Sequence, residues 1–126
     1  MEKQKIRKVT VRFSKRLKFE MQESIIHQGY GLHGKSKWLG DAIINFLEQR
    51  NYIELVEHAV NINQSELSEV EAFYLKEATI ISLRSALLKV RVKYPLLEGV
   101  QSAFIRACVI YRLMLKLSFP DQRIEI

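Results

Sequence analysis

The chain has 126 residues, 48% of them hydrophobic, which is enough for one compact domain or for two small units that share a core. Its formal charge of +6 suits an anionic partner. The single cysteine, Cys108, excludes an internal disulfide and a cysteine-based zinc site. No apolar run is long and uncharged enough to span a membrane, and no secretory signal stands at the start, so we expect a cytoplasmic protein with no membrane partner.

Charge is unevenly distributed along the chain. Residues 1–50 carry 11 Lys and Arg against 5 Asp and Glu, and residues 51–70 carry 4 acidic residues and no Lys or Arg. Residues 71–126 carry 9 basic residues against 5 acidic ones. Two basic blocks therefore flank an acidic middle.

The first predicted element is a short strand over residues 8–13. Its odd positions are apolar and point toward a core, whereas its even positions, Lys8, Thr10 and Arg12, point the other way. A lone strand is not stable, so this one must pair with another. A ribbon with a cationic, hydrogen-bonding outer face has the groups that read base edges in the DNA major groove.

Two predicted helices follow, separated by the glycine-rich turn at residues 29–34. Ser14 can cap the first helix, whose apolar positions recur every four residues, and Gly29 ends it. Ser36 is expected to cap the second helix. After a weak point at Asn51, helical spacing continues through an acidic segment into a polar connector at residues 61–68. The apolar face of the second helix consists of Trp38, Leu39, Ala42, Ile43, Phe46 and Leu47.

The same pattern then begins again, with a second short strand predicted over residues 71–75. The segment Ser102–Ile105 stands 66 positions after Ser36–Leu39. Matching positions in the preceding helices are only 62 residues apart. The increase from 62 to 66 implies about four extra residues in the second turn, and repeats commonly diverge by such loop insertions. The 62-residue offset relates three helical positions to three others: Leu17 to Thr79, Met21 to Leu83, and Ile25 to Leu87.

The order of these elements resembles the ribbon-helix-helix family, which includes the Arc and methionine repressors and several antitoxins. The order is a strand, a helix, a glycine-containing turn and a helix led by Gly-x-Ser. The resemblance is carried by residues 8–13, 17–29 and 34–39, with Ala42 and Ile43. In that family, two chains pair their strands into an antiparallel ribbon that enters the DNA major groove. The resemblance implies a mainly helical fold with a short two-stranded antiparallel β-ribbon.

The repeat suggests that one chain supplies both halves, as a tandem ribbon-helix-helix pseudo-dimer. Residues 1–50 would form the first motif with a basic N-terminal arm, residues 51–70 an acidic helical connector, and residues 71–126 a second, diverged motif sharing one core with the first. Tandem copies of this kind resemble some accessory proteins of conjugative-plasmid relaxosomes. The second strand departs from the pattern, because Glu71 replaces Val9 at the matching position. This departure argues against direct base reading by the second half.

The resemblance assigns base reading to Lys8, Thr10 and Arg12. Arg12 can bond guanine in a bidentate way, Lys8 can donate to guanine, and Thr10 can hydrogen-bond or touch a thymine methyl group. The alternative is that these three side chains form the solvated face of a sheet.

Phosphate binding is expected at the start of the second helix, where Lys35, Ser36 and Lys37 combine free N–H groups with positive charge. The side chain of Ser36 also fits a plain helix cap. The matching start in the second half, residues 101–103, has no lysine, so we expect weaker anchoring there. The basic tail also fits a solvated arm. Candidates for accessory DNA contacts are Lys3, Lys5, Arg7, Tyr74 and Ser102.

The leading hypothesis is sequence-specific binding of double-stranded DNA, as a transcriptional regulator such as a repressor or as a relaxosome accessory factor in plasmid conjugation. A homodimer or a higher assembly on DNA stays open, as does a protein partner. The first alternative is an antitoxin-like protein in which residues 51–126 form a helical partner-binding or oligomerisation module. The second is a helical interaction protein that does not bind DNA. No motif predicts an enzyme, a metal site or a cofactor.

Overall fold

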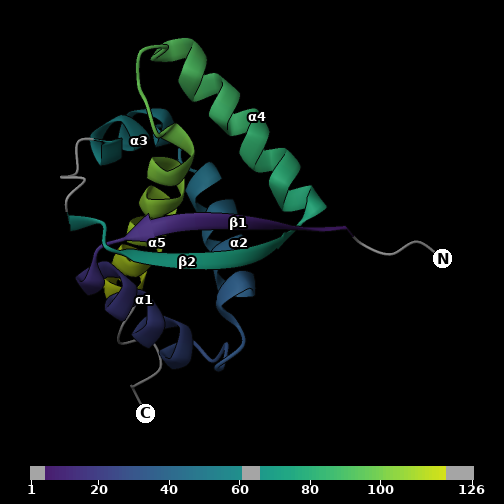
Figure 1. The fold of residues 1–126 in the computed structure, drawn as a ribbon, viewed down its shortest axis with the longest axis vertical. Helices are drawn as coiled ribbons and strands as arrows, with labels where there is room; N and C mark the ends of the chain where they lie inside the picture. The colour runs from purple at the N-terminus through teal and green to yellow at the C-terminus, as the bar shows by residue number, and fades with distance from the viewer. Residues whose placement is uncertain (1–4, 61–65, 119–126) are drawn as a thin grey trace.

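The computed structural model describes residues 5–60 and 66–118, with the side chains of residues 5–57 and 66–115. The chain is mainly helical with a single two-stranded ribbon in this part, as expected (Figure 1). In chain order the elements are β1 (Ile6–Phe13), α1 (Lys15–His27), α2 (Lys35–Leu47), α3 (Tyr52–Val60), β2 (Glu69–Lys76), α4 (Glu77–Lys93) and α5 (Val100–Ser118).

The two strands pair with each other within the chain and run antiparallel. Thr10 lies opposite Ala72, and Val9 lies opposite Phe73. β1 begins two residues before the predicted strand, and β2 extends beyond its predicted bounds at both ends. The partner that β1 requires is therefore supplied 62 residues further along the same chain.

The ends of α1 follow their predicted signals, whereas the start of α2 does not. Ser14 caps α1, since its Oγ accepts a hydrogen bond from the N–H of Leu17 at 3.1 Å. α2 begins at Lys35 and its N-cap is Gly34, so the expected capping role of Ser36 was wrong. Ser36 lies inside the first turn, and its hydroxyl accepts a hydrogen bond from the main chain of β2 instead.

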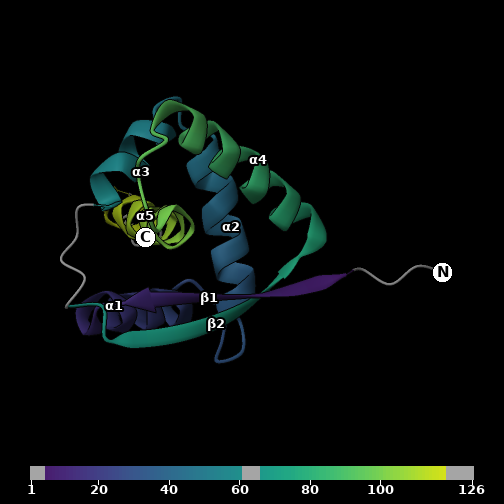
Figure 2. The same cartoon turned by 45° about the horizontal axis from the view of Figure 1, so that its top comes forward.

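The core is one cluster that takes side chains from both strands and from all five helices. The rings of Phe13 and Phe73 meet edge to face across the ribbon, with centroids 6.2 Å apart. Phe46 of α2 and Phe104 of α5 meet in the same way at 5.3 Å. The ribbon runs along one side of this core, and α2, α3, α4 and α5 surround the core on the side away from the ribbon's exposed face (Figure 2).

The tryptophan and the cysteine of the chain belong to this core. Trp38 and Cys108 are both fully buried. Burial raises the pKa of the Cys108 thiol well above its ordinary value. Both therefore act as packing residues. None of the helices in the described ranges is long and apolar enough to cross a membrane.

Candidate nucleic-acid interface

The ribbon presents one face to solvent, as the alternation in β1 predicts. Lys8, Thr10 and Arg12 are all exposed on this face, whereas the residues between them are buried. The register places Tyr74, Ala72 and Val70 of β2 directly opposite these three. We call the six residues the outer ribbon face.

The outer ribbon face is chemically asymmetric. Its β1 side carries two cations and a hydroxyl, and its β2 side carries two aliphatic side chains and Tyr74, which is 53% exposed. Neither Lys8 nor Arg12 forms an ion pair with any residue that the structure describes. Their charged groups are therefore available to a ligand, and the β2 side offers apolar contact.

A helix side chain hydrogen-bonds to each edge of the ribbon. On the β2 edge, the N–H of Tyr74 donates to Oγ of Ser36 at 2.8 Å. On the β1 edge, Nη1 of Arg106 in α5 donates to the main-chain oxygen of Arg12 at 3.1 Å. Each contact occupies one main-chain group that a further strand would need, on an element that has two strands. A two-stranded ribbon is the width that the DNA major groove admits.

The three residues predicted to bind phosphate have different surroundings. Nζ of Lys35 lies 2.7 Å from a carboxylate oxygen of Glu71 and 5.5 Å from the ring centroid of Phe73. Lys37 is exposed, with Nζ 6.0 Å from the ring centroid of Tyr30. The hydroxyl of Ser36 is bonded to the ribbon. Of the two lysines, Lys37 is therefore the more accessible cation.

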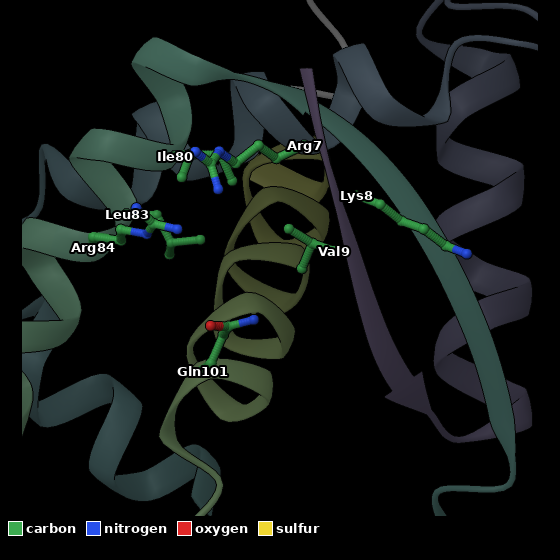
Figure 3. Close-up of a pocket in the computed structure, with 7 residues that line it drawn as sticks. All are labelled: Arg7, Lys8, Val9, Ile80, Leu83, Arg84 and Gln101. Carbon is green, nitrogen blue, oxygen red and sulfur yellow. The ribbon is translucent and has the colours of Figure 1, made fainter. Parts of the chain in front are cut away.

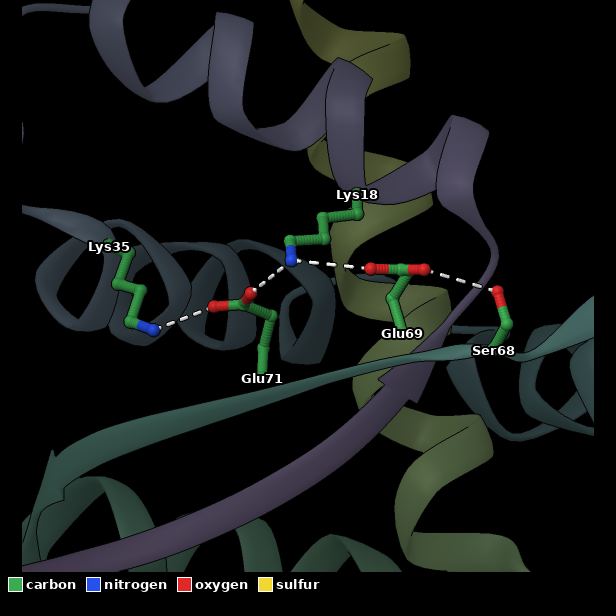
Figure 4. A network of polar contacts seen from close by, with 5 residues as sticks. All are labelled: Lys18, Lys35, Ser68, Glu69 and Glu71. Atoms are coloured by element: carbon green, nitrogen blue, oxygen red, sulfur yellow. Dashed lines mark hydrogen bonds and ion pairs between the residues drawn. The ribbon is translucent and has the colours of Figure 1, made fainter.

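Glu71 lies at the centre of an ion-pair network beneath the ribbon (Figure 4). Besides Lys35, it contacts Nζ of Lys18 at 2.9 Å, and Lys18 also lies 3.5 Å from Glu69. Burial raises the pKa of Glu71, but the hydrogen bonds from Lys35 and Lys18 outweigh it and leave the pKa below its ordinary value. The hydrogen bond to Glu71 raises the pKa of Lys18. A charge on the inner side of the ribbon is thus neutralised by two lysines from α1 and α2.

The predicted accessory residues are dispersed. Tyr74 belongs to the outer ribbon face, Lys5 is exposed just before β1, and Arg7 is exposed near the start of this strand. Ser102 lies half-buried in the first turn of α5. Lys3 lies outside the described residues. The structure therefore brings Tyr74 together with the base-reading candidates and leaves Ser102 on a separate element.

Two arginines of α5 have roles that the sequence did not indicate. Arg106 is 3% exposed, and its Nε has no hydrogen-bond partner among the described residues. Arg112 donates to the Tyr30 hydroxyl at 2.9 Å and to Oε1 of Gln28 at 3.2 Å, and it also bonds Asn45. Both side chains join α5 to distant parts of the chain. A charged residue within an apolar helical run is the one signal that could have drawn attention to them.

A scan against protein-family models finds no match for this chain, and searches of curated proteins and of solved structures find none either.

Proposed function

We propose that this protein binds specific sequences of double-stranded DNA by placing the outer ribbon face in the major groove. The observation that carries the proposal is the exposure of Lys8, Thr10 and Arg12 side by side on one strand, with neither cation in an ion pair within the described residues. Such a protein would act as a transcriptional regulator or as a relaxosome accessory factor.

The composition of the face suits base reading by one strand and apolar contact by the other. Guanidinium and ammonium groups donate to guanine, and a good bidentate pair discriminates against the wrong base by about 1–3 kcal/mol. Val70 and Ala72 can contact thymine methyl groups, a contact that the groove offers to small apolar side chains. The two strands would then read different features, so the preferred site need not be palindromic.

We further propose that the chain is a tandem pseudo-dimer of two ribbon-helix-helix halves, and the strand register supports it. Thr10 lies opposite Ala72, the residue 62 positions later, so the centre of the ribbon pairs two equivalent positions of the repeat. The N-caps of α1 and α4, Ser14 and Lys76, differ by the same 62 positions and both have extended backbones, with ψ of 158° and 153°. An approximate two-fold axis through the ribbon would produce both relations.

The burial pattern of the helices gives further support. The buried residues Met21, Ser24 and Ile25 of α1 correspond at this offset to the buried residues Leu83, Ala86 and Leu87 of α4. At an offset of 66, four buried residues of α2 correspond to four buried residues of α5: Trp38 to Phe104, Leu39 to Ile105, Ala42 to Cys108, and Ile43 to Val109.

A protein partner is the second candidate function, favoured by the outward face of α4. Ile81, Leu88 and Val92 are exposed there in addition to the apolar face that α4 buries. A cleft of about 410 Å³ between α4 and the residues Leu47 and Tyr52 adjoins this face. The antitoxin-like arrangement, with two chains paired through residues 1–50, has less support because β1 already has a partner within the chain.

Selection of the purified chain against a random duplex library tests the proposal. We expect enrichment of a defined site and binding that weakens steeply with salt. Absence of any duplex complex at low salt would overturn it. The mass in solution tests the tandem arrangement separately. A monomer that binds one asymmetric site supports it, and an obligate dimer would support pairing between chains.

A further inference from the structure

A basic cleft lies between β1 and α4, beside the ribbon. It has a volume of about 340 Å³. Three largely buried side chains, Val9, Ile80 and Leu83, form its apolar part. Arg7, Arg84 and Gln101 are exposed at its rim, and Lys8 completes the lining. We call it the Arg7–Arg84 cleft.

The two arginines enter this cleft from opposite sides. Arg7 extends from β1 toward α4, and Arg84 extends from α4 back toward β1, whereas Lys8 points away to the outer ribbon face (Figure 3). No acidic residue lines the cleft, and neither arginine forms an ion pair in the described part of the chain. Two unpaired guanidinium groups at one cleft repel each other, so a bound anion would relieve an unfavourable charge arrangement.

The matching cleft, beside α1, has a balanced charge arrangement. It has a volume of about 230 Å³, and its lining includes Lys35 and Glu71. At the 62-residue offset Glu71 corresponds to Val9 and Glu69 to Arg7. The cleft beside α1 holds Glu71 of β2, which Lys18 and Lys35 neutralise, whereas the cleft beside α4 leaves its cations uncompensated. Similar backbone geometry thus produces one neutral cleft and one basic cleft.

We propose that the Arg7–Arg84 cleft binds a phosphate group. The guanidinium fork matches the oxygen geometry of phosphate and can bond it in a bidentate way. Gln101, in the first turn of α5, adds an amide donor, and that turn has no acidic residue to oppose an anion. The first source of phosphate is the DNA backbone beside the ribbon, and this source rests on the proposed function. The second is a free phosphate group, which does not.

The Arg7–Arg84 cleft supplies the positive charge that the start of α5 lacks. The sequence predicts weak phosphate anchoring by residues 101–103 because no lysine stands there. Arginines from β1 and α4 bring positive charge to the same place from elsewhere in the chain. DNA would therefore be anchored through Arg7 and Arg84 beside α4, and through Lys37 and the amides at the start of α2.

The first experiment uses inorganic phosphate as the probe on the full chain. Amide resonances of Arg84 and Gln101 are followed by NMR during titration with sodium phosphate, and chloride at equal ionic strength serves as the reference. We expect saturable shifts in the wild type that are lost in Arg84→Gln. The matched control is Arg91→Gln, which removes the same charge from an exposed site on the same helix and should leave the shifts intact.

The second experiment measures duplex affinity against salt for the same three proteins. Each phosphate contact contributes about 0.9 to the slope of log affinity against log salt, so Arg84→Gln should lower the slope by about that amount and Arg91→Gln should not. A lower slope in Arg84→Gln identifies the DNA backbone as the source. If the chain shows phosphate-dependent shifts but binds no duplex, the cleft is supported as a site for free phosphate. The proposed DNA-binding function then fails. If both variants bind duplex with equal slopes and no resonance shifts with phosphate, the proposal of a phosphate site in the cleft is wrong. The proposed DNA-binding function is then unaffected.

Discussion

Nη1 of Arg106 lies 3.1 Å from the main-chain oxygen of Arg12, which joins the middle of α5 to the end of β1. The contact is made from inside the protein, because Arg106 is almost fully buried and burial lowers the pKa of its guanidinium. It fixes the backbone of the residue whose side chain we propose reads guanine. A core residue thus sets the position of a surface residue.

Arg106→Ala is expected to lower the free energy of unfolding by about 2–4 kcal/mol. The substitution removes a buried aliphatic stem and leaves the main-chain oxygen of Arg12 without this donor. Urea denaturation gives the difference directly. Arg91→Ala, at an exposed position of α4, should change it by less than about 0.5 kcal/mol. Equal losses in the two variants would show that Arg106 does not support the ribbon.

Arg12→Ala should relax the preference for the selected site more than it weakens binding overall. Loss of a bidentate contact to guanine costs about 1–3 kcal/mol of discrimination at one base pair. Competition between the selected duplex and a variant at that base pair measures the effect. Arg16 provides the control, because it is an exposed arginine of α1 that pairs with Glu20 at 3.2 Å. If Arg16→Ala relaxes the preference equally, the outer ribbon face is not the reading surface.

The ion pairs of Glu71 should make stability depend on pH in the acid range. The pKa of Glu71 is lowered in the folded protein from an ordinary value of 4.5, so the folded state favours the charged form. The resulting stabilisation, about 1 kcal/mol, is fully present above pH 4.5 and is lost as the pH falls through the lowered pKa.

Glu71→Gln removes this dependence and therefore tests it. At neutral pH the wild type should be more stable than the variant, and the difference should shrink in acid. Unfolding by urea at several pH values measures the difference. Glu20→Gln, at an exposed ion pair, should stay within about 0.5 kcal/mol of the wild type throughout. A difference that does not vary with pH would mean that Glu71 acts through packing alone.

Local patterns in the sequence predict the ribbon and the ends of α1. Alternation in residues 8–13 separates the outer ribbon face from the core, and Ser14 marks the start of α1 because a hydroxyl there can bond a free N–H. The proposed repeat predicts the strand at residues 71–75 despite its glutamate. These features depend on neighbouring residues, which a sequence displays directly.

The remaining features depend on residues far apart in the chain. Lys35 meets Glu71 across 36 positions, and Arg106 meets Arg12 across 94. Helical periodicity predicts that a charged residue faces solvent, but Arg106 is buried and Arg112 is half-buried, because their partners come from other elements. The Arg7–Arg84 cleft likewise exists only after β1 and α4 are packed together.

Two glycines, one at the N-cap of α2 and one inside this helix, should respond to alanine in opposite ways. At Gly34 a Cβ atom would collide with the main-chain oxygen of Tyr30, so the turn before α2 would have to move. At Gly40, inside α2, the same atom would meet nothing within 4 Å. Gly34→Ala should therefore destabilise the protein by about 1–3 kcal/mol, since the backbone must shift to accommodate it. Gly40→Ala should stabilise it by about 0.5–1 kcal/mol, because alanine loses less conformational entropy than glycine when the helix forms.

Thermal unfolding of both variants tests these two predictions. A stabilised Gly34→Ala variant would contradict the close approach of Tyr30 that sets the start of α2.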